Sequence, residues 1–261
     1  MSVNRLQGIR VLVTRPAQQA AEFCAAIESE AGIALRLPLL AIQANDNETA
    51  KQRCHSVADY DLVIFISTNA VSYALPLLPH TDWPGQTRIA AIGRATADTL
   101  ESASLNVDVL PERASNSEAM LEALACEDLH DKRVLIVRGK GGRETLAKGL
   151  GAKGAIVDYA EVYQRVCPDV APGQLASLLQ GGIDIITVAS GETLFNLTAT
   201  IKNSDLDVKQ TQDLLDLPLV VASGRIAELA SQSGFTGEVI VTDEPGRDGF
   251  INAIASWQDK V

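Results

Sequence analysis

The clearest pattern along the chain is a short apolar run that turns polar at once. Residues Leu62–Ile66 are all apolar, and Ser67, Thr68 and Asn69 follow directly. A continuous apolar run of this length is typical of a strand in a parallel sheet, because both faces of such a strand are covered. Ser, Thr and Asn are favoured helix N-caps, so the pattern predicts that the chain passes from this strand straight into a helix.

The same pattern occurs again at Asp184–Leu194. The aspartates that precede the two runs, and the serines that follow them, are each 123 positions apart (61 to 184 and 67 to 190). Other segments recur in the same order: IRVLVTR resembles KRVLIVRG, and RIAAIGRATA resembles LVVASGRIA. A constant offset in separate segments favours a duplication, with repeats at about 8–125 and 130–257.

Strand-like apolar runs alternate with helical patterns along the whole chain. This alternation predicts parallel sheets with helices on both faces. In detail, we expect a helix at Asn45–Asp59, a strand at Val107–Leu110, a capping box at Ser115–Glu118 that opens the helix Glu118–Ala125, and one polar helical segment from Thr193 to about Gln212.

Polar residues stand where many of the predicted strands end. In parallel α/β sheets, ligands bind beyond the carboxyl ends of the strands. Backbone N–H groups and guanidinium groups at such ends bind carboxylates or phosphates. The serines, threonines and glycines could instead only cap helices and form turns, but the arginines are not needed for capping. The strand ends carry Thr14, Arg15, Ser67, Thr68, Asn69, Gly93, Arg94, Arg138, Gly139, Ser190, Gly191, Ser223, Gly224 and Arg225.

The composition and charge of the chain limit what it can bind. Its 261 residues suit one large domain or two of about 100–150 residues each. Hydrophobic residues make up 46% and charged residues 21%, which is typical of a globular rather than a disordered protein. The net charge of −11 argues against non-specific binding to DNA, RNA or anionic lipid. An anionic substrate would therefore need positive groups concentrated in one place.

Targeting and metal-binding signals are not visible in the sequence. No apolar run reaches the roughly 18 residues of a membrane span, and the first residues, MSVNRLQGIRVLV, lack the features of a signal peptide. We therefore expect a cytoplasmic protein. The cysteines at 24, 54, 126 and 167 are not in CxxC spacing and the three histidines are scattered, so reduced thiols that mostly pack in the core are expected.

Nucleotide-binding and nucleophile motifs are not matched either. The glycine-rich segment GKGGRE at 139–144 does not satisfy GxGxxG, and neither a Walker loop nor a GxSxG elbow occurs. A nucleotide-dependent transferase is therefore disfavoured. The pattern favours a site that binds and shapes a polyanion without a metal or nucleotide.

Six segments, taken in order, resemble one known family. They are VLVTRP at 11–16, DLVIFISTNAV at 61–71, AAIGRATADTL at 90–100, VLIVRGKGGRETL at 134–146, EVYQR at 161–165 and SGRIAELA at 223–230. Together they resemble the uroporphyrinogen-III synthases over nearly the whole chain.

The resemblance implies an α/β fold of two domains, each a parallel β-sheet flanked by helices, joined by a two-stranded extended linker. These domains do not follow the two repeats. Residues 1–38 and 168–261 are expected to form one discontinuous domain and residues 44–160 the other, with residues 39–43 and 161–167 as the linkers. Pro38 and Pro168 bracket the linker segments.

The resemblance also implies a reaction. Members of this family cyclise hydroxymethylbilane, a linear tetrapyrrole, to uroporphyrinogen III in porphyrin and haem biosynthesis, with inversion of the terminal pyrrole ring and loss of water. No cofactor and no metal are expected. A monomer is expected that contacts the preceding pathway enzyme transiently and binds neither nucleic acid nor a membrane. The alternative from another class is a non-catalytic, two-lobed binding protein for an acidic small molecule.

Site residues are carried over from the resemblance by motif. Tyr163, in EVYQR, matches the family's catalytic tyrosine, whose phenol can donate a proton or hydrogen bond to the leaving hydroxyl group. The alternative is a linker tyrosine that only packs its ring. Thr96 and Arg143 match substrate-binding residues, with helix capping and a solvated arginine as the alternatives. The full set expected to bind substrate is Thr14, Arg15, Ser67, Thr68, Asn69, Thr96, Gly139, Arg143, Ser190, Gly191, Ser223 and Arg225.

Overall fold

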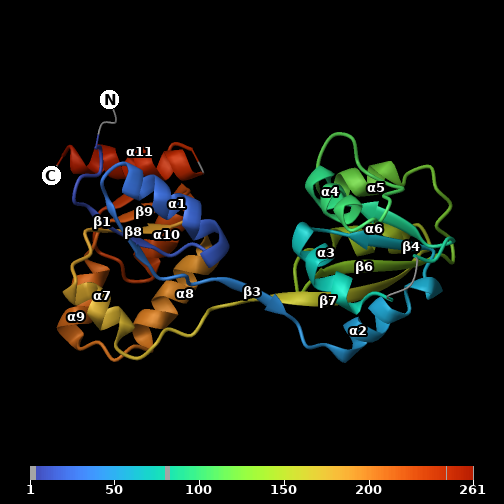
Figure 1. The fold of residues 1–261 in the computed structure, drawn as a ribbon, viewed down its shortest axis with the longest axis horizontal. Coiled ribbons are helices and arrows are strands. Elements are labelled where there is room, and N and C mark those ends of the chain that lie inside the picture. Colours follow the sequence, from blue (N-terminus) through green and yellow to red (C-terminus); the bar gives the residue numbers. More distant parts are fainter. Residues whose placement is uncertain (1–3, 80–82, 245, 261) are drawn as a thin grey trace. The chain divides into compact units, whose positions relative to one another are not determined.

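The chain folds into two compact α/β units. The computed structural model describes residues 4–79, 83–244 and 246–260. Unit 1 consists of Met1–Ala41 and Val166–Val261, and unit 2 consists of Ile42–Arg165 (Figure 1). Each unit has its own five-stranded sheet, in which parallel pairs predominate. This confirms the predicted class, with two mainly parallel sheets flanked by helices.

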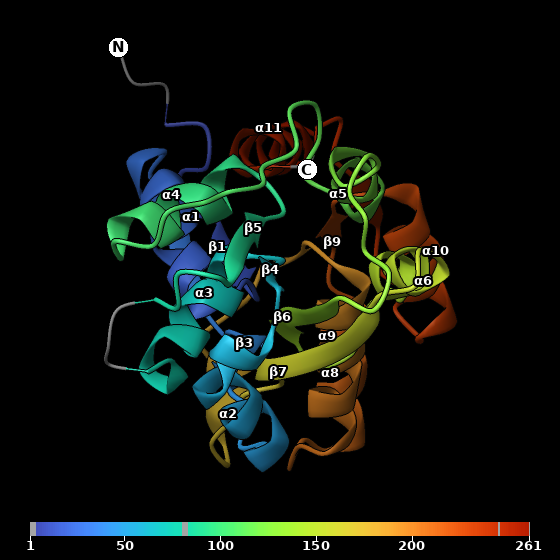
Figure 2. The same ribbon diagram turned by 90° about the vertical axis from the view of Figure 1, so that its right-hand side faces the viewer.

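Unit 2 contains the apolar run of residues 62–66. Its sheet has the order β3-β7-β6-β4-β5. Helices α5 and α6 cover one face, and α2, α3 and α4 cover the other (Figure 2). The strands are β3 (Ala41–Ala44), β4 (Leu62–Phe65), β5 (Arg88–Ala91), β6 (Arg133–Gly139) and β7 (Ile156–Val166). The helices are α2 (Glu48–His55), α3 (Thr68–Ala74), α4 (Arg94–Ser102), α5 (Ser117–Ala123) and α6 (Thr145–Ala152), with 3₁₀ turns at Val57–Asp59 and Leu75–Leu77.

The residues of β4 show why its apolar run is continuous. Leu62 and Ile64 pack into the cluster beneath α5 and α6, whereas Val63 and Phe65 pack into the cluster on the opposite face. Successive side chains of a strand point to opposite faces, so a strand covered on both sides needs apolar residues at every position.

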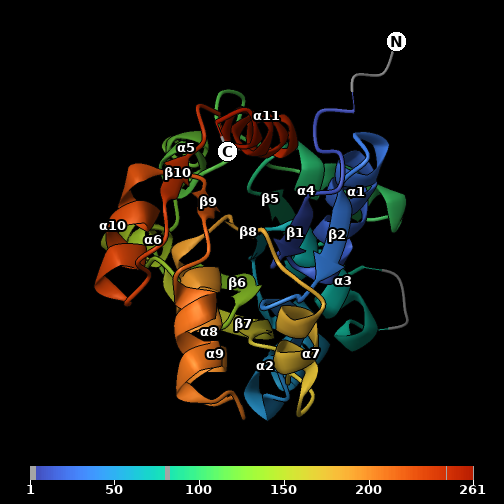
Figure 3. The ribbon, with the colours of Figure 1, turned by 90° about the vertical axis from the view of Figure 1, so that its left-hand side faces the viewer.

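Unit 1 has a sheet of order β10-β9-β8-β1-β2, in which all neighbouring strands are parallel. Helices α1 and α11 pack on one face, and α7 to α10 pack on the other (Figure 3). The strands are β1 (Arg10–Val13), β2 (Ile33–Arg36), β8 (Ile185–Val188), β9 (Leu219–Val221) and β10 (Val239–Val241). The helices are α1 (Ala17–Ser29), α7 (Gln174–Gln180), α8 (Gly191–Lys202), α9 (Val208–Leu215), α10 (Gly224–Gln232) and α11 (Arg247–Gln258).

The two sheets match when the repeats are compared. In unit 1, β2 and β1 of the first repeat lie beside β8 and β9 of the second. In unit 2, β7 and β6 of the second repeat lie beside β4 and β5 of the first. Each repeat therefore gives its first strands to one unit and its later strands to the other. The matching order supports the duplication inferred from the constant offset.

Three local predictions were wrong. The expected strand at Val107–Leu110 is only an isolated bridge between Val109 and Ala90. The polar segment after Thr193 is not one helix, because α8 ends at Lys202 and Asp207 begins α9 with a capping box. The expected helix at Asn45–Asp59 is shorter, with Asn47 as its N-cap and a 3₁₀ turn at its end.

The capping box predicted at Ser115 was also wrong. The N-cap of α5 is Asn116, whose side-chain oxygen accepts a hydrogen bond from the Ala119 N–H at 2.8 Å. Ser115 instead packs against Gly93, where an added Cβ would lie 1.9 Å from the Ser115 Oγ. Asn and Ser are about equally good N-caps, so local sequence could not decide between neighbours.

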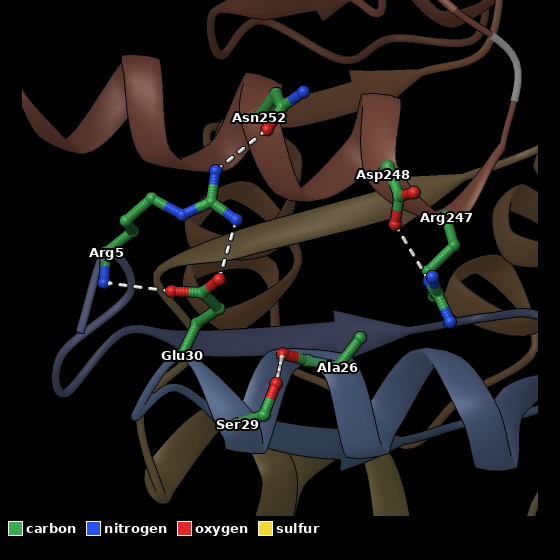
Figure 4. A network of polar contacts seen from close by, with 7 residues as sticks. All are labelled: Arg5, Ala26, Ser29, Glu30, Arg247, Asp248 and Asn252. Carbon is green, nitrogen blue, oxygen red and sulfur yellow. Dashed lines mark hydrogen bonds and ion pairs between the residues drawn. The ribbon is translucent and has the colours of Figure 1, made fainter. Parts of the chain in front are cut away.

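A polar network fastens the first residues of unit 1 to two helices (Figure 4). The Arg5 guanidinium donates to Glu30, at the end of α1, at 2.6 Å, and to Asn252 of α11 at 2.9 Å. The hydrogen bond from Arg5 lowers the pKa of Glu30, and the hydrogen bond to Glu30 raises the pKa of Arg5. Arg247 donates to its chain neighbour Asp248 at 2.8 Å.

Replacing Arg5 by alanine is expected to lower the melting temperature at pH 7 by no more than about 3 °C, since the pair is exposed. A carboxylate whose pKa is depressed in the folded state contributes stability above its unfolded pKa and loses it as the pH falls. The difference in melting temperature between wild type and variant should therefore shrink as the pH falls below the ordinary glutamate pKa of about 4.3. Melting curves between pH 3 and 7 test this. A difference in melting temperature that stays constant between pH 3 and 7 would contradict this expectation.

Candidate functional site

In each sheet, two neighbouring strands are followed by connections that run toward opposite edges of the sheet. The position between these two strands is the topological switch point. In unit 2 this place lies between β4 and β6, because β5 lies on the far side of β4 and β7 on the far side of β6. In unit 1 it lies between β1 and β8. In open α/β sheets, ligands bind beyond the carboxyl ends of the strands at this switch point.

Unit 2 has a pocket of about 260 Å³ at these strand ends. Ile66 follows β4, Ile92 follows β5, and Gly139 ends β6; all three line the pocket. Of the described lining residues, four are cationic and none carries a carboxylate. In a chain of net charge −11, this is a local concentration of positive charge suited to an anion. The polar and charged lining residues are Ser115, Asn116, Ser117, Arg138, Lys140, Arg143, Tyr159, Tyr163 and Arg165.

Tyr163 reaches this pocket through an irregularity in β7. Arg138 pairs with Glu161, but the next residue of β6, Gly139, pairs with Tyr163, so β7 contains a bulge. As a result, Val162 and Tyr163 pack against the same apolar cluster although they are neighbours in the chain. Bulges of this kind redirect side chains and are frequent beside active sites.

The phenol of Tyr163 lies against Ser67, Gly139 and Tyr73. The side chain is buried, with 8% of the residue exposed, and its hydroxyl lies 3.2 Å from the Ser67 Oγ. Its ring lies against Gly139, where an added Cβ would be 2.5 Å from the ring, and 5.8 Å from the ring of Tyr73. Ser67 also caps α3, because its Oγ accepts from the Ala70 N–H at 3.0 Å. The predicted passage from this strand straight into a capped helix is therefore confirmed, and the same Ser67 oxygen lies beside the phenol.

The second tyrosine of the pocket is bound differently. The Tyr159 hydroxyl donates to Glu144 at 2.5 Å. Burial, followed by this hydrogen bond, raises the pKa of Tyr159 to about 12. The same hydrogen bond is the main cause of the lowered pKa of Glu144. Tyr159 is thus engaged with a carboxylate, which makes it a poorer proton donor than a phenol beside a hydroxyl group.

Residues Gly139–Gly142, three glycines and Lys140, form a turn at the edge of the pocket. The Lys140 N–H donates to the Tyr163 carbonyl at 2.7 Å, and the Gly141 N–H donates to Glu161 at 2.9 Å. Arg143 follows, with a side chain 71% exposed and 3.7 Å from the carboxylate of Glu118. Its guanidinium is therefore available to a ligand, because the ion pair with Glu118 that would be lost is weak and exposed to solvent.

The other candidates of unit 2 lie beside the pocket without lining it. Thr68 and Asn69 occupy the first turn of α3. Thr96 is 4% exposed in the first turn of α4, and its N–H donates to the Gly93 carbonyl at 3.1 Å. The structure thus brings together Ser67, Gly139, Arg143 and Tyr163 from the predicted set.

The candidates of unit 1 have mixed environments. Thr14 is fully buried and donates to the Thr187 carbonyl at 2.6 Å, so its hydroxyl joins β1 to β8. The guanidinium carbon of Arg15 lies 4.6 Å from the Phe23 ring centre and 4.9 Å from that of Phe250. Its buried Nε has no hydrogen-bond partner among the residues that the structure describes, and burial lowers the pKa of Arg15. A cation held between two rings with an unused donor is suited to an anionic ligand.

The remaining strand-end residues of unit 1 start helices. Ser190 caps α8 by accepting from the Thr193 N–H at 3.1 Å, and Gly191 is the first residue of that helix. Ser223 stands at the N-cap of α10 but makes no capping hydrogen bond, and both Ser223 and Arg225 are exposed.

Sequence reasoning missed several lining residues. Lys140 and Arg165 lie within matched motifs, so their charge was a usable signal. Ser117 gave no such signal, because the first turn of α5 lies beside the end of β6 only in three dimensions.

Two features are absent from the described part of the chain. No cluster of three or more His, Cys, Asp or Glu side chains is placed there to hold a metal ion. None of its helices combines the length and the apolar character needed to cross a membrane.

The family model and the curated relatives point to one family. A family model described as uroporphyrinogen-III synthase HemD matches residues 21–252. The chain is similar to the uroporphyrinogen-III synthase of Escherichia coli (strain K12), with 30% identity over 250 residues that cover 94% of this chain and 99% of the relative. The Salmonella typhimurium enzyme of the same name is 31% identical over 249 residues, which cover 94% and 99%.

Solved structures agree in fold. The crystal structure of uroporphyrinogen-III synthetase from Helicobacter pylori 26695 has a TM-score of 0.60 at 15% identity, covering 95% of this chain and 99% of that one. A mutant uroporphyrinogen III synthase from the thermophilic bacterium Thermus thermophilus has a TM-score of 0.55 at 15% identity, covering 97% and 100%. At this identity the likeness concerns the fold alone.

Proposed function

The chain belongs to the uroporphyrinogen-III synthase family, and on this premise we propose that it converts hydroxymethylbilane to uroporphyrinogen III, inverting the terminal pyrrole ring and releasing water. The match to the family model over residues 21–252 is the observation that carries this function. The cationic pocket of unit 2 supports it, because the substrate of this family carries many carboxylates.

The reaction places three demands on the protein. Hydroxide leaves the terminal hydroxymethyl carbon with a proton from an acid, which releases water and leaves an electrophilic azafulvene. The last pyrrole attacks through its substituted carbon, and the resulting spiro intermediate fragments and closes with that ring inverted. The protein must supply the acid, bind the carboxylates, and hold the chain so that the competing ring carbon is out of reach. Such positioning contributes up to about 7–11 kcal/mol in favourable systems.

We assign the acid role to Tyr163. Its hydroxyl faces Ser67 at 3.2 Å within the strand-end region, whereas the Tyr159 hydroxyl is bonded to Glu144. A neutral hydroxyl partner leaves the phenol proton free to be shared with a leaving group. The N-cap hydrogen bond from the Ala70 N–H holds Ser67 in place. From this position the Ser67 hydroxyl orients the phenol.

Carboxylate binding is assigned first to the side chains of Lys140 and Arg143. The other predicted substrate-binding residues, including Arg15 of unit 1 with its unused Nε, are further candidates for this role. We retain residues 39–43 and 161–167 as linkers, which the pairing of β3 with β7 supports. A cytoplasmic monomer that meets the preceding pathway enzyme transiently is also proposed, from the family resemblance.

Replacing Arg143 by glutamine is expected to raise KM by about fivefold with little change in kcat, since an exposed ion pair contributes up to about 1 kcal/mol. Because the attraction is screened, the difference should shrink as salt is added. Steady-state kinetics at several salt concentrations test this. Arg88→Gln is the control, because Arg88 begins β5 and binds Glu127. Equal KM values for the Arg143 variant and wild type would remove Arg143 from the binding site.

The function is tested by supplying hydroxymethylbilane and separating isomers I and III of the product. Isomer III formed without any added cofactor is the expected result. Isomer I alone, in the amount formed without protein, would refute the proposal. Heat-denatured protein provides the baseline for unassisted cyclisation.

A further inference from the structure

We propose that Arg138 is a positioning residue, which fixes the turn of residues 139–142 and, through that turn, the phenol of Tyr163. The inference rests on the function proposed for this pocket and adds to it a residue that acts through others. It departs from the expectation drawn from the sequence, in which an arginine at a strand end indicated anion binding.

Arg138 is buried although it is an arginine. Only 3% of the residue is exposed, at the end of β6. Its Nε donates to the Gly139 carbonyl at 3.2 Å, one terminal nitrogen donates to Glu144 at 3.2 Å, and the other donates to the Gly141 carbonyl. A buried charge is tolerated when it is paired and hydrogen-bonded in this way. All three nitrogens are therefore engaged by the protein itself, which argues against Arg138 as a primary carboxylate ligand.

The acceptors of Arg138 define what it holds. Two of these acceptors are the carbonyls of Gly139 and Gly141. The guanidinium therefore lies inside the turn and fixes the path of its backbone. Gly141 and Gly142 have φ of +75° and +106°, which favours glycine. A Cβ on Gly142 would lie 2.6 Å from a terminal nitrogen of Arg138. At Gly142 the turn thus lies so close to the guanidinium that there is no room for a side chain.

Two residues of this turn set the position of Tyr163. Its first residue, Gly139, lies against the face of the Tyr163 ring, and an added Cβ there would be 2.5 Å from the ring. Its second residue, Lys140, donates its N–H to the Tyr163 carbonyl at 2.7 Å. A shift of the turn therefore moves both the wall behind the ring and the backbone that carries it.

Glu144 and Tyr159 hold the guanidinium from the other side. The guanidinium carbon lies 4.8 Å from the centre of the Tyr159 ring, and the Tyr159 hydroxyl binds the second oxygen of Glu144 at 2.5 Å. The planar guanidinium of arginine can donate to two carbonyls and a carboxylate while it stacks on an aromatic ring, whereas a lysine ammonium cannot. Charge alone should therefore not restore the function of Arg138.

The test is Arg138→Lys, with Arg133→Lys as the matched control. Arg133 lies on the same strand, with its guanidinium carbon also 4.8 Å from a tyrosine ring, that of Tyr60, and a terminal nitrogen 3.6 Å from Asp158. We expect Arg138→Lys to lower kcat about 10- to 100-fold with KM nearly unchanged and to raise the share of isomer I, since small displacements in an active site have effects of this size. The control should retain wild-type kcat and isomer ratio.

Amide hydrogen exchange at residues 140–143 measures the turn without substrate. It should be faster in Arg138→Lys than in wild type or Arg133→Lys, after correction for global stability. Unchanged exchange, or equal kcat in both variants per folded molecule, would overturn the inference. If wild-type protein forms no isomer III, the proposed function fails, whereas the exchange comparison still decides whether Arg138 positions the turn.

A second variant guards against loss of folding. Glu144 is half exposed, so Glu144→Gln removes the charge that faces Arg138 with less effect on the core. It should reproduce the faster exchange and the fall in kcat in weaker form. Wild-type exchange and wild-type kcat in this variant would contradict a role of the network in positioning.

Discussion

Replacement of Tyr163 by phenylalanine is expected to lower kcat by about 100-fold or more while KM stays near the wild-type value. A positioned general acid typically contributes roughly 10²–10⁴-fold, and the variant removes only the hydroxyl that would supply the proton. The ring contacts with Gly139 and Tyr73 remain, so substrate binding and folding should change little. Steady-state kinetics with separation of isomers I and III measure both parameters and the fate of the substrate.

Tyr73→Phe is the control for this experiment. The Tyr73 ring lies 5.8 Å from that of Tyr163, but its hydroxyl donates to the Ile42 carbonyl at 2.8 Å. Its loss should therefore reduce stability slightly without the fall in kcat. Equal kcat in wild type and Tyr163→Phe would limit Tyr163 to packing. Saturable binding of hydroxymethylbilane with no turnover in the wild type would favour a non-catalytic binding protein.

The second large effect is expected from Gly139→Ala. The added methyl group would lie 2.5 Å from Cε2 and 2.6 Å from Cζ of Tyr163, so the ring or the strand must move. Overpacking of this kind destabilises proteins by about 1–3 kcal/mol. Because the displaced atoms adjoin the phenolic oxygen, kcat should fall about 100-fold as well, in line with the sensitivity of catalysis to ångström-scale misplacement. Thermal unfolding and steady-state kinetics on the same preparation measure the two effects.

Gly151→Ala separates the steric effect from a general effect of replacing glycine. Gly151 lies in α6, and an added Cβ would meet no atom within 4 Å. In a helix this change is expected to stabilise by about 0.5–1 kcal/mol. A Gly139→Ala protein with wild-type kcat would mean that the exact position of the Tyr163 ring does not matter, and the acid role would then be in doubt.

The fold class was predictable because its signals are local. A buried parallel strand such as β4 must be apolar at every position, and the serine after it must cap the next helix, so both features are visible in a few residues. The strand-end rule then placed Ser67 and Gly139 in the pocket region of unit 2. The family resemblance added Tyr163 and Arg143, which no local pattern identifies.

Other features depend on what packs against a residue, and these could not be predicted. Thr14 has the same local pattern as Ser67, yet its hydroxyl joins two strands inside the sheet. Arg138 stands at a strand end like Arg15, but its acceptors come from a turn that follows it. The bulge that redirects Tyr163 depends on the register between β6 and β7, which the sequence of either strand alone does not specify.

The exchange of strands between the repeats has a consequence for how the chain folds during synthesis. Residues 42–165 are continuous, so unit 2 can fold while the ribosome is still making the rest of unit 1. In unit 1, by contrast, Val11 pairs with Ile185, 174 positions further along the chain (11 to 185). The nascent N-terminal strand must therefore wait for its neighbour, and a chain that stops before β8 leaves the apolar edge of β1 open to aggregation.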